Sequence, residues 1–432
     1  MTEHEAGTPR IYWITEGFYP PIVGGQELFA ANLVRALTER GAQVSVITRQ
    51  TVPPAAPAES IGRVGIRRIP PAGILKGRGW SAVLPLLGYL LRLTFLLLTE
   101  ARRYDIVILS GVKIAPIVAV PICRVFGKKC ILRVESFFEL HEAVSAQSLR
   151  EMNAGWGRLF VNVSGRLRRA GMLAGNAVIA ISSQISSELL RLGVPDERIR
   201  RIPNAVNLAL FKPLSTAERS LLRVRLGLPA HRTLLIFSAR LSRAKGLPML
   251  IEAWPGLRAR HPDLCLLVVG SGHMSFDDCE QQVKDFVREH GLQDDVLFLG
   301  ESDRVHELLQ AADMFVFPTE YEGFSLALVE ALGCAMPVVA TSVGAAPDLI
   351  GDGASGFLFP PQDPEAMVAA LERALAMREQ WPQIGSAARA SVMPYEIGAV
   401  ADQYLGLCTE LMRPGREPVL ATESKHPIDP RG

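Results

Sequence analysis

Paired cysteines and clustered metal ligands are missing from this 432-residue sequence. None of its six cysteines belongs to a Cys-x-x-Cys pair, and no Cys/His group has the spacing of a zinc site. Scattered cysteines of this kind predict reduced and mostly buried thiols, as in cytosolic proteins. The first ten residues lack the apolar run of a signal peptide, so we also expect no secretory signal.

A strong charge of one sign is missing as well. Charged residues make up 21% of the chain and hydrophobic residues 48%, which excludes a disordered chain and indicates a globular one. The net charge is only +2, but residues 1–213 carry 27 Lys and Arg against 15 Asp and Glu, so the remainder is acidic. This asymmetry predicts two surfaces with different partners, and we expect neither partner to be a nucleic acid.

Strand and helix patterns alternate along most of the chain. Apolar strands are expected at 10–15, 43–48, 105–109, 130–134, 177–181, 234–238, 264–269, 296–299, 314–317 and 338–341. This α/β alternation predicts parallel sheets covered by helices on both faces. The alternation stops at Ile202–Pro213. We therefore expect a first domain at 1–205, a linker at 206–213 and a second domain at 214–392. A C-terminal helix at 393–412 should return to the first domain, and a disordered tail should follow at 413–432.

One apolar run, Ser81–Thr99, is almost long enough to span a bilayer, which takes about 20 apolar residues. Pro85 and Arg92 interrupt the run, and the next strand must belong to the sheet. A soluble helix is therefore the better interpretation. Two interpretations stay open: a buried helix that covers the sheet, or a helix whose outer face dips into an anionic membrane, since basic residues flank it.

The segment Glu320–Val339 combines a strand end, a loop and a helix that begins near Ser325. Glu322 lies in the loop, and Glu330 lies about a turn and a half inside the helix. The free backbone amides of Phe324, Ser325 and Leu326 would point toward an anion such as a phosphate. A carboxylate deeper in such a site accepts hydrogen bonds from a vicinal diol. An ordinary capped helix with glutamates on its wet face is the alternative.

A second loop, Ser238–Gly246, follows an apolar strand directly and contains Arg240 and Lys245. The carboxyl end of a parallel strand is where α/β domains usually bind ligands. Because arginine offers a bidentate fork and lysine a point charge, the pair suits a diphosphate. A solvated basic loop is the alternative.

Together these motifs resemble the family 4 glycosyltransferases, which carry the glycosyl transferases group 1 domain and have the GT-B fold. The Glu–seven residues–Glu signature is matched by Glu322 and Glu330, and the R-x-x-x-x-K-G loop by Arg240, Lys245 and Gly246. Further matches are a Gly-Gly loop at 24–25, before the first helix, and three segments at 202–207, 337–348 and 352–361. The resemblance spans residues 10–411 and implies two Rossmann-like, doubly wound domains that face each other across a cleft.

The resemblance also implies a role for each matched residue. Arg240 and Lys245 would grip the diphosphate of a nucleotide-sugar, and Glu330 would hold its ribose. Glu322 would contact hydroxyls of the transferred sugar. Backbone groups at Phe324, Ser325 and Leu326 would complete the phosphate cradle, and Gly24 and Gly25 would let the first domain approach closely.

The chain departs from the family pattern at the end of an N-terminal strand, where a histidine is usual. Glu135 occupies this place in Cys130–Glu142, with Arg133 before it and His141 beyond it. We include Glu135 among the candidate catalytic residues, with Glu322, Arg240 and Lys245. The segment Asn204–Asn207 lacks the usual Gly and Asp, which is a conservative change for a hinge.

The implied reaction is retaining transfer of a sugar, of the hexosyltransferase type, to a hydroxyl acceptor in cell-surface polysaccharide or glycolipid assembly. No D-x-D pattern is present, so we expect no metal and no other cofactor. A sugar-nucleotide 2-epimerase and a non-catalytic nucleotide-sugar-binding relative remain as alternatives. The basic first half favours a saccharide or lipid-linked acceptor, with the protein in the cytoplasm or peripheral on the inner face of an anionic membrane.

Overall fold

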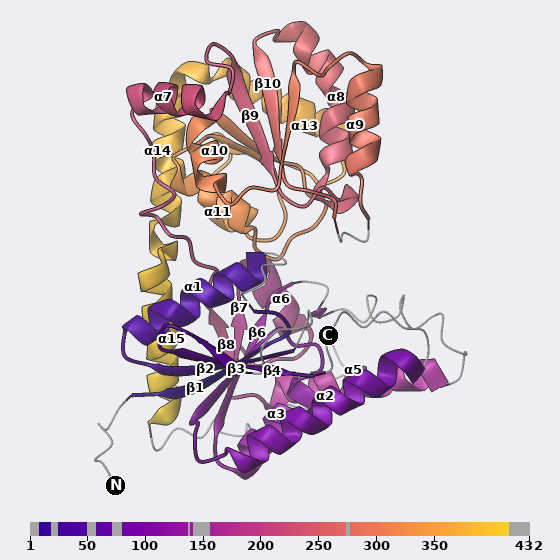
Figure 1. Ribbon diagram of the computed structural model, residues 1–432, viewed down its shortest axis with the longest axis vertical. Helices are drawn as coiled ribbons and strands as arrows, with labels where there is room; N and C mark the ends of the chain where they lie inside the picture. The colour runs from indigo at the N-terminus through magenta and orange to yellow at the C-terminus, as the bar shows by residue number, and fades with distance from the viewer. Residues whose placement is uncertain are drawn as a thin grey trace, which may run out of the picture.

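The protein is described by a computed structural model, which places residues 8–18, 25–49, 58–70, 80–136, 139–140, 156–273 and 277–413. Within these ranges the chain forms two sheets, one in each half of the sequence, each covered by helices (Figure 1). The expected α/β architecture of two doubly wound domains is confirmed. Gly24 and His141 fall outside the described residues, as does nearly all of the expected disordered tail.

The N-terminal sheet has the strand order β3-β4-β2-β1-β5-β6-β7-β8. Its strands are β1 (Arg10–Thr15), β2 (Gln43–Arg49), β3 (Ala58–Ile61), β4 (Val64–Ile69), β5 (Ile106–Ser110), β6 (Lys129–Val134), β7 (Ala177–Ala180) and β8 (Ile199–Arg201). All pairs are parallel except β3 with β4, which form a hairpin. Its helices are α1 (Gly25–Glu39), α2 (Trp80–Thr99), α3 (Pro116–Val125), α5 (Trp156–Ala174), α6 (Ser183–Arg191) and the 3-10 turn η2 (Asp196–Arg198).

The C-terminal sheet is wholly parallel, with the order β11-β10-β9-β12-β13-β14. Its strands are β9 (Thr233–Ser238), β10 (Leu264–Val269), β11 (Val296–Gly300), β12 (Met314–Phe317), β13 (Val338–Thr341) and β14 (Phe357–Phe359). Its helices are α7 (Thr216–Leu226), α8 (Leu247–Arg260), α9 (Glu280–Glu289), α10 (Val305–Ala311), α11 (Leu326–Gly333), α12 (Ala346–Leu349), α13 (Pro364–Ala376) and α14 (Trp381–Val392), with 3-10 turns η3 (Arg243–Lys245), η4 (Arg378–Gln380) and η5 (Met393–Tyr395).

The central strands form as expected because their residues are apolar on both faces. Every residue of β5 and of β10 is buried, as befits a parallel strand between two helical layers. The sequence interpretation missed β3, β4, β8 and β14. The hairpin β3–β4 and the strand β8 carry charged residues, and the apolar run of β14, Phe357–Phe359, is only three residues long.

The helix expected at Ser81–Thr99 exists as α2, and its two sides have different surroundings. Tyr89, Leu93 and Leu97 are buried against the domain, whereas Leu91 and Phe95 are 71% and 70% exposed. The interpretation of a helix that covers the sheet is therefore correct for the inner side of α2, while the outer side presents apolar side chains. No helix in the described ranges has the length and apolarity to cross a bilayer.

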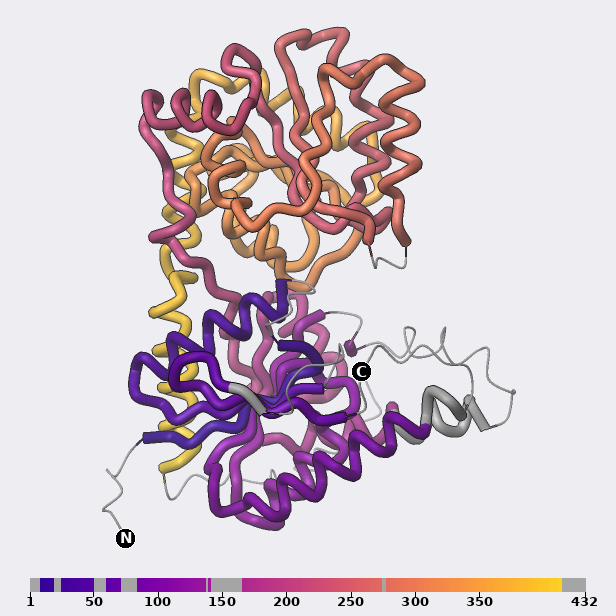
Figure 2. The backbone as a smooth tube through the Cα atoms, in the orientation of Figure 1, coloured from indigo at the N-terminus to yellow at the C-terminus, as the bar shows by residue number. Residues whose placement is uncertain are grey.

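The last helix, α15 (Ile397–Met412), leaves the C-terminal domain and packs along α1 of the N-terminal domain. In Figure 2 the yellow trace of α14 and α15 runs down one side of both domains, with α15 beside the N-terminal one. Tyr404 on α15 is fully buried beside Trp13 of β1, with ring centroids 5.9 Å apart. The ion pairs Arg40–Asp402 and Arg200–Glu410, at 2.7 and 3.0 Å, lie at the rim of this contact. An aromatic core contact therefore holds the two ends of the chain together.

We predict that Tyr404→Ala lowers the free energy of unfolding by about 3 kcal/mol, because it leaves a cavity against Trp13 in a core that has little room to collapse. Urea denaturation measures the change. Gln403→Ala, on the exposed side of the same helix, is the control and should cost less than about 0.5 kcal/mol. Equal losses in both variants would contradict a buried anchor at Tyr404.

Candidate active site at the strand ends

The order of strands in the C-terminal sheet reverses between β9 and β12, which pair directly through Leu235 and Met314. Ligands in open α/β sheets bind at such a switch, beyond the carboxyl ends of the strands. The loop after β9 contains Arg240 and Lys245, and the loop after β12 contains Glu322. The sheet topology therefore brings both sequence motifs to one place.

The two loops touch through their backbones. The amide of Glu320 donates to the carbonyl of Ala244 at 2.9 Å, and the hydroxyl of Thr319 donates to the same oxygen at 3.1 Å. Gly246 has a φ of 75°, and a Cβ there would lie 1.9 Å from the carbonyl oxygen of Pro318. Only glycine fits this contact, which explains the glycine that ends the basic loop.

Lys245 and Glu322 form an ion pair across these loops, with 2.5 Å between the ammonium nitrogen and Oε2. Both side chains are largely shielded, at 15% and 21% exposure. The Arg240 side chain is exposed and makes no hydrogen bond or ion pair with the described residues, although its charge acts on the Tyr321 hydroxyl nearby. Lys245 is thus neutralised by Glu322, whereas Arg240 is available to an anion.

The N-terminus of α11 lies beside these side chains. The hydroxyl of Ser325 accepts from the amide of Leu328 at 3.2 Å and caps the helix. The amides of Phe324, Ser325, Leu326 and Ala327 donate to no partner within the described ranges. The Phe324 ring is buried near Tyr395, 6.0 Å between centroids, so its backbone is fixed. The arrangement offers amide donors and a positive helix end to a phosphate.

Glu330 lies on α11, one turn inside the helix. Protein surrounds its carboxylate, although part of the side chain stays accessible, and burial raises the pKa of Glu330 to about 7. The Glu330 carboxylate makes no hydrogen bond or ion pair with the described residues, which is unusual for a shielded carboxylate. A ligand with paired hydroxyls would supply the missing donors.

The N-terminal domain reaches this site at two glycines. A Cβ on Gly25, at the start of α1, would lie 3.0 Å from the Leu326 side chain at the start of α11. A Cβ on Gly323 would lie 2.5 Å from the carbonyl oxygen of Glu135, which follows β6. The segment that contains Glu322 and Glu330 therefore faces the first helix and the Glu135 loop of the other domain.

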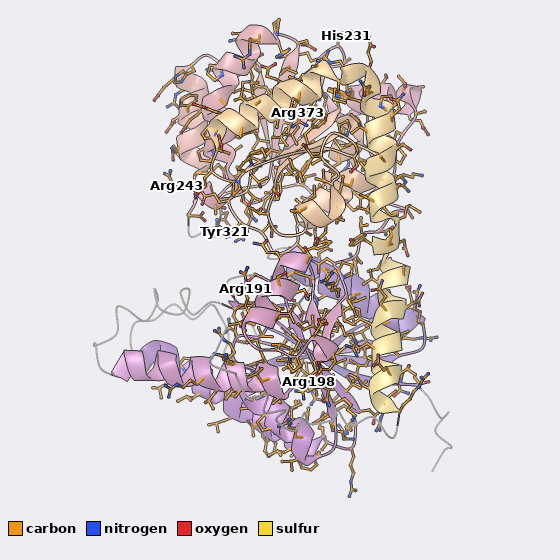
Figure 3. All side chains as sticks on the ribbon, turned by 180° about the vertical axis from the view of Figure 1, so that it is seen from behind. Arg191, Arg198, His231, Arg243, Tyr321 and Arg373 are labelled. Carbon is orange, nitrogen blue, oxygen red and sulfur yellow. The ribbon has the colours of Figure 1, made fainter. Side chains whose placement is uncertain are left out.

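Helix α6 makes a third junction between the domains. The Ser183 amide donates to Asp348 at 2.8 Å, and the Ser183 hydroxyl makes a second, shorter bond to the same carboxylate. The Gly344 amide donates to the Gln184 side chain at 2.7 Å. Figure 3 shows Tyr321 and Arg243 at the lower border of the C-terminal domain, with Arg191 of α6 on the opposing domain.

The Glu135 side chain belongs to a buried polar network that sequence reasoning missed. Its Oε1 accepts short hydrogen bonds from Arg133 and from the Ser110 hydroxyl. The Arg133 guanidinium is 1% exposed, lies 4.4 Å from the centre of the Phe29 ring, and also donates to Asn204. Arginine within the apolar strand CILRV was the available signal, because a buried cation needs a partner.

Glu139 adds a second buried carboxyl group next to this network. Its Oε2 accepts from the Glu135 amide at 3.0 Å. Burial, and secondly the negative charge of Glu135, raise the pKa of Glu139 to about 7. Lys113, paired with Glu16 at 2.8 Å, acts in the opposite direction. No group of three or more His, Cys, Asp and Glu suited to a metal ion occurs among the described residues.

Models of two families match the two halves of the chain. The model described as Glycosyltransferase Family 4 matches residues 23–210, and that described as Glycosyl transferases group 1 matches residues 218–391. A D-inositol 3-phosphate glycosyltransferase of Nocardiopsis dassonvillei is 30% identical over 372 residues, which are 82% of each chain. The chain is a family 4 glycosyltransferase.

Solved structures with the GT-B fold resemble this glycosyltransferase over nearly its full length. Sucrose-phosphate synthase from Thermosynechococcus elongatus is 25% identical, with a TM-score of 0.75, and the alignment covers 93% of this chain and 99% of that one. Anabaena HepE in complex with UDP is 21% identical, with a TM-score of 0.71 and coverage of 93% and 100%. The GT-B fold expected from the sequence is confirmed.

For this glycosyltransferase we predict that Glu330→Gln raises stability at high pH. The folded protein keeps a proton on Glu330 that the unfolded chain releases, so Glu330 makes stability fall as pH rises from about 4.5 to 7. At pH 8 the variant should be more stable by about 3 kcal/mol, and near pH 4.5 the difference should vanish. Glu289→Gln, exposed on α9, is the control. A pH-independent effect at Glu330 would contradict a buried carboxylate.

We predict further that Arg133 and Glu135 are energetically coupled. Arg133→Met should lower the free energy of unfolding by about 3 kcal/mol, because it leaves the Glu135 charge buried without its cation. The double variant Arg133→Met/Glu135→Gln should recover at least about 1 kcal/mol of this loss. Chemical denaturation of the four proteins in the cycle gives the coupling, and strictly additive losses would rule the pair out.

Proposed function

We propose that this glycosyltransferase moves a hexosyl group, with retention of anomeric configuration, from a nucleotide-diphosphate sugar to an acceptor hydroxyl. The observation that carries the proposal is the meeting of Arg240, Lys245 and the free amides of α11 at one strand switch. This combination suits a diphosphate. The UDP complex of HepE, a structure of the same fold, supports a nucleotide-bound donor.

Each group in the site has a separate task in this proposal. Arg240, Lys245 and the α11 amides hold the diphosphate and stabilise the negative charge that grows on it as the glycosidic bond breaks. Glu330 accepts hydrogen bonds from the ribose hydroxyls. Glu322, released from part of its contact with Lys245, binds hydroxyls of the transferred sugar.

The acceptor approaches from the N-terminal domain in this proposal. Its hydroxyl attacks the anomeric carbon from the face that the diphosphate leaves, and a phosphate oxygen of the donor takes the proton. Retention follows from attack on that face. Glu135 lies at the domain boundary through its contact with Gly323, and we propose that it orients the acceptor or the sugar.

Saccharide or lipid-linked acceptors fit the basic N-terminal half best, and the pathway we propose is cell-surface polysaccharide or glycolipid assembly. The protein would work in the cytoplasm, at the inner face of a membrane. Incubation with a panel of nucleotide sugars and such acceptors tests the proposal. Proton NMR of the glycoside should show the anomeric configuration of the donor, whereas an inverted product, or free epimerised nucleotide sugar, would refute it.

We predict that Arg240→Ala and Lys245→Ala each lower kcat/KM by roughly 30- to 1000-fold, because each removes about 2–4 kcal/mol of stabilisation from the leaving group. Steady-state kinetics measure the loss, with circular dichroism as a check on folding. Arg288→Ala is a matched control, since Arg288 is 64% exposed and pairs at 2.7 Å with Asp285 on the same helix, α9. Unchanged kinetics in a folded Arg240→Ala/Lys245→Ala double variant would refute the assignment.

We predict that transfer needs no divalent metal, because two cationic side chains and a helix N-terminus already face the diphosphate. Turnover should be retained after exhaustive chelation with EDTA. Loss of activity that magnesium or manganese restores would show that the diphosphate is held through an ion instead.

A further inference from the structure

Three neighbouring helices of the N-terminal domain contain no acidic residue. They are α2, α3 and α5, and their sequences include six arginines and neither Asp nor Glu. Helix α3 packs against both α2 and α5. Figure 1 shows α2 along the lower border of the N-terminal domain, away from the C-terminal domain. One side of this domain therefore presents helices whose only charges are positive.

Helix α2 carries a continuous apolar stripe on its outer side. Leu84, Leu87, Leu91, Phe95 and Leu98 are 62%, 41%, 71%, 70% and 45% exposed. Their spacing of three and four residues places them within one quarter of the helix circumference, over a length of about 21 Å. The opposite side of α2 is buried in the domain, so the core does not need the side chains of the stripe. An exposed stripe of this size marks an interaction surface.

An open groove of about 600 Å³ runs between the stripe and the end of β4. Leu91, Phe95 and Leu96 form its apolar wall, and Arg92 and Arg67 stand at its edge. Glu100, the acidic residue in this lining, is neutralised by Arg67 at 2.8 Å and Arg103 at 3.2 Å. The groove thus has an apolar wall and a cationic edge, which together suit a phospholipid with an anionic headgroup.

We infer that α2 lies in the interface of an anionic phospholipid bilayer, with its stripe among the acyl chains and the arginines at the phosphates. This inference rests on the proposed function and names the surface that brings a lipid-linked acceptor to the enzyme. An amphipathic helix with apolar side chains on one face and only basic charges beside it binds in this way. A second copy fits less well, because a symmetric contact would bring arginine-bearing helices together.

The stripe and the active site lie on connected parts of the domain. Tyr89, on the inner side of α2, lines a narrow cavity with Glu16, Ser110 and Lys113 at the ends of β1 and β5. Ser110 also bonds to Glu135, which contacts Gly323 of the other domain. A bilayer along α2 therefore binds the same domain whose Glu135 loop contacts the donor-site loop.

Vesicle co-sedimentation tests the inference with the full chain. The vesicles are phosphatidylcholine alone, or phosphatidylcholine with about one third phosphatidylglycerol. The wild-type protein should sediment with the anionic vesicles at low salt and less as salt rises. Leu91→Asn/Phe95→Asn should weaken this partitioning at least roughly tenfold, since it removes the two most exposed apolar side chains of the stripe.

The control is Leu221→Asn/Val224→Asn on α7, where the two side chains are 72% and 71% exposed. It should sediment like the wild type. Wild-type protein that stays in the supernatant, or a stripe variant that sediments normally, would overturn the inference. A stripe variant that converts a dimer into a monomer on gel filtration would also overturn it, in favour of a second copy.

Donor binding separates this inference from the proposed function. The stripe variant should bind nucleoside diphosphates as the wild type does, because α2 is remote from Arg240 and Lys245. If vesicle binding behaves as expected while no nucleotide sugar is bound or transferred, the docking surface stands and the proposed function fails. If a nucleotide sugar is bound and transferred while the anionic vesicles are not bound, the proposed function stands and the membrane inference fails.

Discussion

The reversal of strand order between β9 and β12 is the constraint on which the site depends. It leaves the ends of two adjacent strands without a helix crossing above them, and each strand end leads into a loop that carries candidate site residues. Hydrogen bonds from the Thr319 hydroxyl and the Glu320 amide to the Ala244 carbonyl hold these loops together. Lys245 and Glu322, which are 77 residues apart, consequently meet at 2.5 Å.

The N-terminal domain forms the opposite side of the site, and a buried arginine network holds that side in place. Arg133 is buried on β6 and joins Glu135, Ser110 and Asn204, so a strand end and the segment that leads to the second domain share one guanidinium. Helix α15 returns to the same domain and buries Tyr404 beside Trp13. The N-terminal domain is therefore braced at both points where the chain passes between domains, which favours motion of whole domains over distortion of the site.

The sequence predicted the fold well wherever a strand is buried on both faces, because β5 and β10 are continuous apolar runs. It missed β8 and β14, which are only three residues long, and the charged hairpin β3–β4. Arg240, Lys245, Glu322 and Glu330 were found through spacing, since each motif lies within one loop and helix. The arginine in the apolar strand CILRV signalled that Arg133 needs a partner. The identity of its partners and the contact of Glu135 with Gly323 were not predictable, because they depend on how separate segments approach in space.

The central claim is that the site at the β9–β12 switch binds a diphosphate. Isothermal titration with UDP, GDP and ADP, each compared with its nucleoside monophosphate in the presence of EDTA, tests it most directly. The account predicts that at least one diphosphate binds roughly tenfold or more tightly than its monophosphate, since the second phosphate gains charged contacts with Lys245 or Arg240. Equal affinity for the two members of every pair, or no binding of any diphosphate, would contradict it.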